Sequence, residues 1–348
     1  MYTEDPATGA STMRALVVTG PAEHGLERVP CPRPGPDQAL VAVTHVALCG
    51  TDLRLLRGTL HDAEYPVVPG HEWAGVVRAA PGRPELVGQP VVGHNFLPCG
   101  GCQWCERGAQ NLCLALDEVG FSLPGAFAEA FCLPAENLRP LPEGLSGAEG
   151  CLVEPLCVAI HAVERAGELT GRTVGVLGAG AVGLLVAQLA VAGGAKSVTV
   201  ADPSAHRRTI AADLGLGVRP DLQAWHEDPQ DVVFDATGVA AVFPDGLVAT
   251  QQGGTYVLVG YSGEDRTPFE PSAVMLRELT VVGSLSGVGM IDRALRAVAD
   301  GSVRLGPLLS EALPLSEYRS VLDIPAERAP LRNIFFVDQD SSRGEGTA

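Results

Sequence analysis

Short apolar runs separated by proline and glycine fill the first part of the chain. Their sequences are ALVVT, ALVAVTHVAL, WAGVVRAA and QPVVGH, at residues 15–19, 39–48, 73–80 and 89–94. Runs of this length between turn-forming residues are typical of β-strands. From Met13 to about residue 150, the pattern therefore predicts a barrel-like unit built of strands.

The pattern changes after Gly171. A strand, a glycine turn, a long apolar helix and a second strand are indicated in turn, at 173–177, 178–183, 184–195 and 197–202. Further apolar runs follow at 231–238, 253–260 and 279–284. Strands this apolar are typically buried on both faces of a parallel sheet. The pattern predicts an α/β chain whose doubly wound domain spans residues 158–300.

The remaining segments complete the expected organisation. Residues 290–301 form a helical pattern that ends at Gly301, and short elements return from residue 307 onward. We expect residues 301–348 to rejoin residues 13–157 in the strand-rich domain. The polar segment 1–12 and the tail from Gln339 have the composition of mobile or disordered ends.

Composition and charge limit the classes of function. A chain of 348 residues with 46% hydrophobic residues can form two cores. The formal charge of −17 argues against nucleic-acid binding, which needs clustered lysine and arginine. No apolar run reaches the ~18 residues of a membrane span, and no N-terminal segment resembles a secretory signal. We expect a cytoplasmic protein that acts on a small molecule, without a nucleic-acid or membrane partner.

Four of the nine cysteines lie in one short loop. Their spacing is C-x2-C-x2-C-x7-C, at Cys99, Cys102, Cys105 and Cys113. Four thiolates this close suit a tetrahedral zinc ion that holds a loop and performs no chemistry. A ferredoxin run has its fourth cysteine sooner, followed by proline, and disulfides are rare among cytosolic thiols. The spacing therefore predicts a structural zinc site.

A nucleotide-binding motif joins a predicted strand to a predicted helix. Gly178, Gly180 and Gly183 form G-x-G-x-x-G, which lets the backbone approach a pyrophosphate at the helix N-terminus. Asp202 ends the next strand, where a carboxylate binds ribose hydroxyls and repels a 2′-phosphate. The alternative role for Asp202 is to cap the helix that begins near Ser204.

Three more residues are assigned to the cofactor site: Val182, Arg207 and Thr237. An arginine near the ribose can accommodate a 2′-phosphate, and both Arg207 and Arg208 follow Asp202 closely. The carboxylate favours NAD, and NADP remains the alternative.

A second set of candidate metal ligands lies outside the cysteine loop. Cys49 stands in ALCGTDL, His71 and Glu72 in PGHEW, and Glu154 in LVEPL. Three protein ligands and one open position make a catalytic zinc site. Spacing alone does not show that these positions meet in the fold.

These motifs resemble those of the zinc-dependent medium-chain dehydrogenases, the group of alcohol, sorbitol and threonine dehydrogenases. The shared pieces are the cysteine loop, GAGAVG with Asp202, CGTD at 49–52, GHE at 70–72 and EPL at 154–156. The resemblance extends from Met13 to about Val337. It implies a GroES-like β-barrel catalytic domain, a Rossmann NAD-binding domain and a homodimer or homotetramer.

The resemblance also implies roles for the second ligand set. It implies two zinc ions per chain, with Cys49 and His71 as ligands of the catalytic ion and Glu72 or Glu154 as the third. Asp52 resembles a carboxylate that orients a ligand, and Thr51 resembles the hydroxyl that accepts the substrate proton. Zinc would lower the pKa of a bound alcohol, whose carbon then gives a hydride to the nicotinamide.

Substrate class is indicated by finer resemblances. Glu154 stands where the alcohol dehydrogenase branch has cysteine, and Arg54 where threonine dehydrogenases usually have histidine. Four stretches resemble the 2-deoxy-scyllo-inosamine dehydrogenases of aminoglycoside antibiotic biosynthesis, at 65–73, 118–130, 137–142 and 308–318. This resemblance implies oxidation of a polyol or aminocyclitol hydroxyl to a ketone. The alternatives are an L-threonine 3-dehydrogenase, a butanediol- or sorbitol-type dehydrogenase, and a non-catalytic protein that binds zinc and nucleotide.

Overall fold

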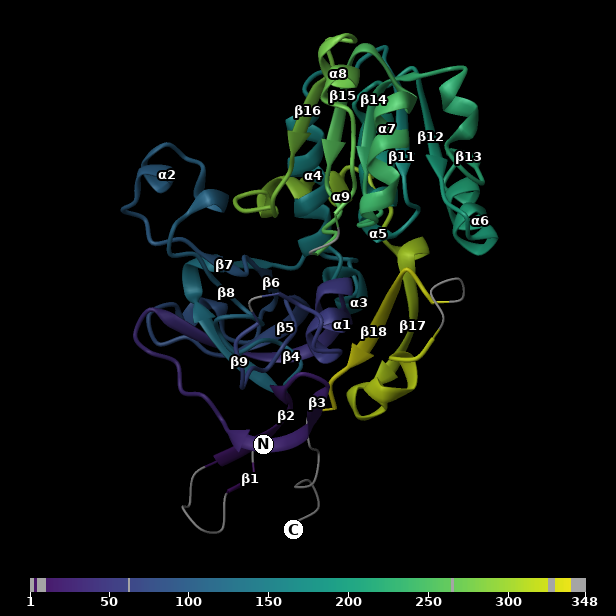
Figure 1. The fold of residues 1–348 in the computed structure, drawn as a ribbon. Coiled ribbons are helices and arrows are strands. Elements are labelled where there is room, and N and C mark those ends of the chain that lie inside the picture. Colours follow the sequence, from purple (N-terminus) through teal and green to yellow (C-terminus); the bar gives the residue numbers. More distant parts are fainter. Residues whose placement is uncertain (1–2, 5–10, 62, 264–265, 325–328, 339–348) are drawn as a thin grey trace. The chain divides into compact units, whose positions relative to one another are not determined.

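In a computed structural model the chain divides into two compact units (Figure 1). Unit 1 comprises residues 1–154, 309–324 and 332–348, and unit 2 comprises residues 155–308 and 325–331. The structure describes residues 3–4, 11–61, 63–263, 266–324 and 329–338. The predicted disordered tail from Gln339 lies outside these residues.

A seven-stranded sheet is the main element of unit 1. Its order is β10-β6-β5-β4-β18-β17, with β9 also paired to β4. The C-terminal strand β18 pairs antiparallel with β4, and β17 runs parallel to β18. The strands are β4 (Gln38–Leu48), β5 (Glu72–Ala79), β6 (Pro90–Gly93), β9 (Ala130–Pro134), β10 (Leu138–Pro140), β17 (Leu309–Pro314) and β18 (Arg332–Phe336).

Two small sheets and short helices complete unit 1. The sheets contain β1 (Thr3–Glu4), β2 (Ser11–Gly20) and β3 (Glu23–Pro30), and β7 (Phe96–Leu97) with β8 (Asp117–Glu118). The α-helices are α1 (Gly50–Leu56), α2 (Gln103–Glu106) and α3 (Gly147–Gly150). The 3-10 helices are η1 (Pro84–Leu86), η2 (Gln110–Leu112), η3 (Ala135–Asn137) and η7 (Leu315–Val321).

The N-terminal expectation needs a correction. Regular structure was expected from Met13, but β2 begins at Ser11 and pairs with Thr3 and Glu4 of β1. The prediction of a structureless leader is therefore wrong for these residues. Polar composition misled it, because an edge pairing uses backbone groups and needs few apolar side chains.

The core of unit 1 comes from inward-facing strand residues. Val41 and Val43 of β4 are fully buried, as is Phe335 of β18. The ring of Phe335 meets that of Phe127 edge-on, with centroids 6.0 Å apart. Because β4 contributes to this core and pairs with three other strands, its C-terminal end is held firmly in place.

Unit 2 is a parallel sheet flanked by helices (Figure 1). Its order is β13-β12-β11-β14-β15-β16, which confirms the α/β doubly wound prediction. The strands are β11 (Thr173–Leu177), β12 (Ser197–Ala201), β13 (Gly217–Arg219), β14 (Gln230–Asp235), β15 (Thr250–Leu258) and β16 (Thr280–Gly283). The helices are α4 (Val153–Ala166), α5 (Ala181–Ala192), α6 (Ala205–Asp213), α7 (Phe243–Ala249), α8 (Pro271–Met275) and α9 (Ile291–Ala299), with 3-10 helices η4 (Gln223–His226), η5 (Ala240–Val242) and η6 (Gly306–Leu308).

Local sequence sets the ends of these helices. The predicted helix at 290–301 is α9, and Gly301 follows it with φ +76°, a conformation that glycine adopts without strain.

Within the described part of the chain, no helix has the length and apolarity needed to cross a membrane.

Candidate metal and nucleotide sites

The C-terminal end of β4 positions the first candidate ligand. β5 pairs with the last residues of β4 on one side, and β18 pairs with them on the other. Cys49 follows β4 as the N-cap residue of α1, and its N–H donates to Asp52 Oδ2 at 3.0 Å. The strand register therefore brings Cys49, Glu72 and Arg332 to the same end of three adjacent strands.

His71 is held from two sides. Its Nδ1 lies 3.5 Å from Oδ1 of Asp52, a carboxylate with no exposed surface. The Asn95 side chain donates to the carbonyl of His71 and accepts the Trp73 Nε1–H at 2.6 Å. Burial lowers the pKa of His71, but the charges and hydrogen bonds of Asp52 and Cys49 together outweigh it, and the net pKa is well above the usual value. With Nδ1 facing Asp52, Nε2 is the nitrogen left for a metal.

Cys49, His71 and Glu72 form a compact donor set. Their ligand atoms all lie within 4.8 Å of one another. One sulfur, one imidazole nitrogen and one carboxylate oxygen are donors that zinc accepts. Thr51 Oγ1 lies 3.7 Å from Cys49 Sγ, so its hydroxyl is at the edge of this set. The chemistry and spacing of these residues fit a catalytic zinc ion.

Glu72 has a partner that sequence reasoning missed. Arg332 Nε lies 2.8 Å and 3.2 Å from the two carboxylate oxygens of Glu72. Glu72 is fully buried and the Arg332 side chain is 12% exposed. The Arg332 Nη2 also lies 3.9 Å from Cys49 Sγ. A single cation therefore balances charge on two candidate ligands.

Two further carboxyl groups interact with the charges of this cluster. Burial raises the pKa of Glu154 to about 8 and that of Glu118 to about 7, and the His71 charge acts on both in the opposite direction. Glu154 does not belong to the three-residue donor set found among the described residues. It is half-buried, and its carboxyl interacts with the charge of Glu72 as well as that of His71. Glu118 was not among the residues predicted for the site.

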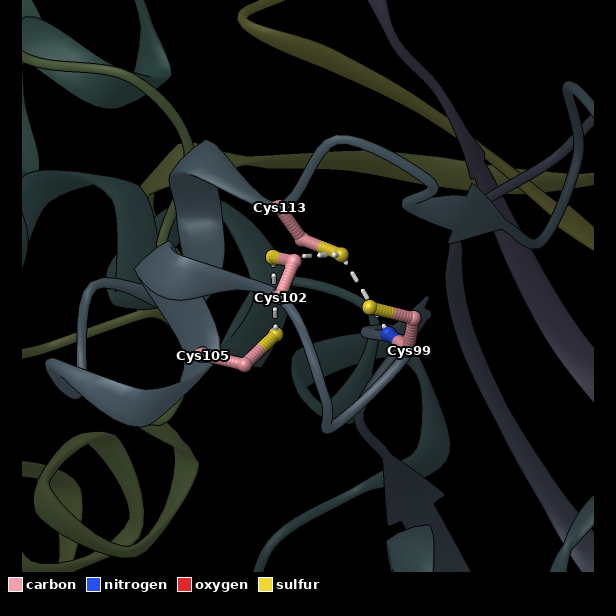
Figure 2. A group of neighbouring side chains, drawn as sticks. All are labelled: Cys99, Cys102, Cys105 and Cys113. Atoms are coloured by element: carbon pink, nitrogen blue, oxygen red, sulfur yellow. Dashed lines mark hydrogen bonds between the residues drawn. The ribbon is translucent and has the colours of Figure 1, made fainter.

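The four loop cysteines converge (Figure 2). Their sulfurs lie within 4.8 Å of one another, with Cys102 Sγ 3.6 Å from that of Cys105 and 3.9 Å from that of Cys113. A tetrahedron with Zn–S bonds of about 2.3 Å has sulfur–sulfur edges of about 3.8 Å. The loop is thus already shaped for a four-thiolate zinc ion.

Hydrogen bonds and burial shift the pKa values of the cysteines in this loop. Backbone N–H groups, chiefly that of Cys105, lower the pKa of Cys102 to about 6. Burial and the hydrogen bond with Cys102 raise the pKa of Cys105 to about 12. Zinc binds thiolates, so it would displace the protons that remain on this loop.

The glycine motif of unit 2 has the geometry of a phosphate cradle. Gly178 has φ +92°, and Gly180 is the N-cap residue of α5. A Cβ at Gly183 would lie 1.9 Å from the carbonyl oxygen of Gly178, so only glycine fits. The backbone is therefore open where a pyrophosphate would meet the helix N-terminus.

Asp202 lies beside this cradle and is nearly fully buried. Its Oδ2 accepts the N–H of Ala179 at 2.8 Å, and its Oδ1 accepts the N–H of Ser204 at 2.8 Å. The carboxylate thus ties the glycine turn to the start of α6, and Ser204 is the N-cap residue of that helix. Arg207 Nη1 lies 3.8 Å from Asp202 Oδ2.

The remaining assigned residues lie near the same sheet edge. Arg208 donates to the carbonyl oxygens of Asp202 and Pro203 at 2.7 and 2.8 Å. The Thr237 hydroxyl donates to Asp235 Oδ1 at 2.6 Å, just after β14. Val182 is half-buried in the first turn of α5.

Comparison with known families matches most of each unit. Residues 35–143 match the model described as the alcohol dehydrogenase GroES-like domain, and residues 181–300 match the model described as zinc-binding dehydrogenase. The cysteine loop and the donor set of Cys49, His71 and Glu72 all lie within the first match.

Individual relatives match nearly the whole chain. It is 31% identical to sorbitol dehydrogenase of Bombyx mori over 93% of this chain and 98% of the relative. It is 35% identical to D-altritol 5-dehydrogenase of Agrobacterium fabrum over 81% of this chain and 87% of the relative. A solved structure from Sinorhizobium meliloti, assigned as a zinc-binding dehydrogenase and bound to NADP, is 31% identical with a TM-score of 0.88, covering 94% of this chain and 99% of that one.

Proposed function

This chain belongs to the zinc-dependent medium-chain dehydrogenases, and we propose that it oxidises a secondary alcohol of a polyol or aminocyclitol to a ketone with NAD. The enzyme is thus an alcohol dehydrogenase that uses zinc and a nicotinamide cofactor. The observation that supports the site most directly is the donor set of Cys49, His71 and Glu72 within 4.8 Å, with Asp52 behind the imidazole.

Cys49 and His71 would hold the catalytic zinc together with a carboxylate. Glu72 is the carboxylate within reach of both, although Arg332 binds it. Glu154 is the second carboxylate near the set, and its raised pKa marks a group that a bound cation would help to ionise. When bound, zinc lowers the pKa of an alcohol and stabilises the negative charge that develops on its oxygen.

Two other residues of the cluster would orient the ligands and accept the substrate proton. Asp52 accepts from Cys49 and Gly70 N–H groups and faces His71 Nδ1, so it fixes both ligand-bearing segments. The Thr51 hydroxyl, 3.7 Å from Cys49 Sγ, would accept the alcohol proton. Proton transfer by a positioned side chain of this kind contributes about 10²–10⁴-fold to rate.

In unit 2, the glycine turn and Asp202 would bind the dinucleotide. A ribose hydroxyl can use the lone pairs of Asp202 that its two backbone hydrogen bonds leave open. The negative charge of the Asp202 carboxylate repels a 2′-phosphate, which favours NAD. Arg207 and Arg208 weaken that opposition, so NADP is the alternative cofactor.

Two features support a polyol-like substrate. The relatives named above are sorbitol and D-altritol dehydrogenases, both named for sugar alcohols. Residues 118–130, one of the stretches that resemble aminocyclitol dehydrogenases, pack against the segment that carries His71: Gly125 N–H donates to the Val68 carbonyl, and Ala126 N–H donates to the Gly70 carbonyl. L-Threonine is the alternative substrate, since L-threonine 3-dehydrogenase of Rhizobium etli is 28% identical.

The test combines metal analysis with a substrate panel. We expect two zinc equivalents per chain and NADH formation with a cyclitol, an aminocyclitol or a linear polyol. Turnover of L-threonine alone would indicate an L-threonine dehydrogenase and not a polyol or aminocyclitol dehydrogenase. Binding of zinc and NAD without turnover of any alcohol would favour the non-catalytic alternative. We also propose a homodimer or homotetramer, which light scattering of the zinc-loaded protein would distinguish.

A further inference from the structure

A turn between β8 and β9 of unit 1 brings a carboxyl-bearing residue, Glu118, next to the segment that carries His71. Glu118 ends β8, and the chain then turns tightly, with the N–H groups of Phe121, Ser122 and Leu123 all donating to the Glu118 carbonyl. Gly120 sits so close to Gly70 that a Cβ there would lie 2.9 Å from the Gly70 nitrogen. The turn is therefore pressed directly onto the segment that leads into His71.

Two further contacts fix its position. Val119 N–H donates to the carbonyl of Asn95, whose side chain binds the carbonyl of His71. The Phe121 ring lies 5.2 Å from the His71 ring, centroid to centroid. The backbone that directly follows Glu118 is thus tied to the ligand-bearing segment, and the charges of His71 and Asp52 act on the Glu118 carboxyl.

The two cationic side chains of this cluster, His71 and Arg332, each already have an acidic partner. Asp52 faces His71, and Glu72 pairs with Arg332. In the described part of the chain, the Glu118 carboxyl forms no salt bridge and no side-chain hydrogen bond, although it is half-buried. Glu118 shares the positive charge of His71 with Asp52, and a ligand that brings a positive charge would give this half-buried carboxylate a cation of its own.

We propose that Glu118 is a specificity-determining residue that pairs with a positively charged amino group on the alcohol substrate. The inference rests on the proposed function of the cluster and narrows its substrate class to polyols and cyclitols that carry an amino group. The ammonium group would donate to the Glu118 carboxylate while the neighbouring hydroxyl is presented to Cys49 and His71. Charged hydrogen bonds of this kind are directional, so they orient the ring as well as bind it.

The experiment compares matched substrates on the zinc-loaded enzyme with saturating NAD. One pair is 2-deoxy-scyllo-inosamine and the same ring with hydroxyl in place of the amine. A second pair is 2-amino-2-deoxy-D-glucitol and D-glucitol. The variant is Glu118→Gln, which keeps the shape and removes the charge. The matched control is Asp117→Asn, which removes the same charge from the exposed neighbouring residue of β8.

We expect the wild type to prefer the amine in each pair that it oxidises. Glu118→Gln should lower kcat/KM for the amine by about 10- to 100-fold, mostly through KM, which is the range of a charged hydrogen bond. It should leave the hydroxyl analogue and the zinc content close to wild type, while Asp117→Asn changes neither substrate. Calorimetric titration with the amine should show the same loss of affinity in Glu118→Gln without turnover.

Other results would overturn the inference. Equal loss for amine and hydroxyl substrates in Glu118→Gln would indicate a structural role only. Oxidation of both members of a pair without preference by the wild type would reject the ammonium partner and leave the dehydrogenase function intact. Oxidation of neither pair, with threonine or simple alcohols turned over instead, would reject the proposed substrate class itself.

Discussion

Replacing Arg332 by methionine tests the ion pair beneath the candidate zinc ligands. Methionine keeps much of the apolar volume of the arginine stem and removes its charge. The substitution leaves Glu72, which has no exposed surface, without the cation 2.8 Å away. Breaking a buried pair from one side costs about 3–5 kcal/mol of unfolding free energy.

Adding Glu72→Gln removes the stranded charge, so the double variant should recover most of the loss. Bound zinc would supply another positive charge, so the zinc-free protein should show the larger effect.

Urea unfolding of the zinc-free protein measures this effect, followed by circular dichroism and by the fluorescence of Trp73, which is buried in unit 1. The control is Arg83→Met, because Arg83 pairs with Glu85 while both side chains are about half exposed, 48% and 60%. Exposed pairs of this kind contribute little to stability. The reasoning is refuted if Arg332→Met costs no more than Arg83→Met, or if Glu72→Gln fails to rescue it.

Four further predictions concern the two metal sites, the cofactor and pH. Cys102→Ser should lose one zinc equivalent and lower thermal stability, whereas Cys49→Ser should keep the fold and abolish turnover; loss of both zinc ions in either variant would contradict separate sites. Asp202→Ala should raise kcat/KM for NADP relative to NAD, and a wild-type preference for NADP would contradict its role. Thr51→Val should lower kcat by about 10²–10⁴-fold with zinc content and NAD affinity retained, while Thr51→Ser stays active; near-normal turnover in the valine variant would exclude the relay. Burial raises the pKa of Glu118 from 4.5 to about 7, so the zinc-free protein should lose stability as pH rises through that interval, and Glu118→Gln should flatten the profile in urea midpoints.

The features predicted from sequence were those whose chemistry is local. The cysteine loop spans Cys99 to Cys113, and its sulfurs converge because a short turn and two single-turn helices suffice to gather them. The glycine motif likewise joins one strand to the helix that follows it. Both needed only neighbouring residues, so spacing was enough to predict them.

The metal cluster of unit 1 depends on long-range register instead. Cys49 and Glu72 meet because β4 and β5 pair antiparallel, which the spacing of the residues did not reveal. The partner of Glu72 is 260 residues away in sequence, and an arginine at the start of an apolar run carries no signal of its pairing. Glu118 follows another acidic residue, Asp117, and nothing in its neighbours along the chain shows that the turn after it packs onto Gly70.

The measurement that tests the central claim most directly is NADH formation from a ring alcohol by zinc-loaded protein and by Cys49→Ser. We expect the wild type to produce one NADH for each ketone formed, and the variant to retain NAD binding and the zinc of the cysteine loop while producing none. Absence of NADH with every cyclitol, aminocyclitol and linear polyol, in wild-type protein that holds two zinc ions and binds NAD, would contradict the account. Equal NADH formation by wild type and Cys49→Ser would contradict the placement of the chemistry at Cys49 and His71.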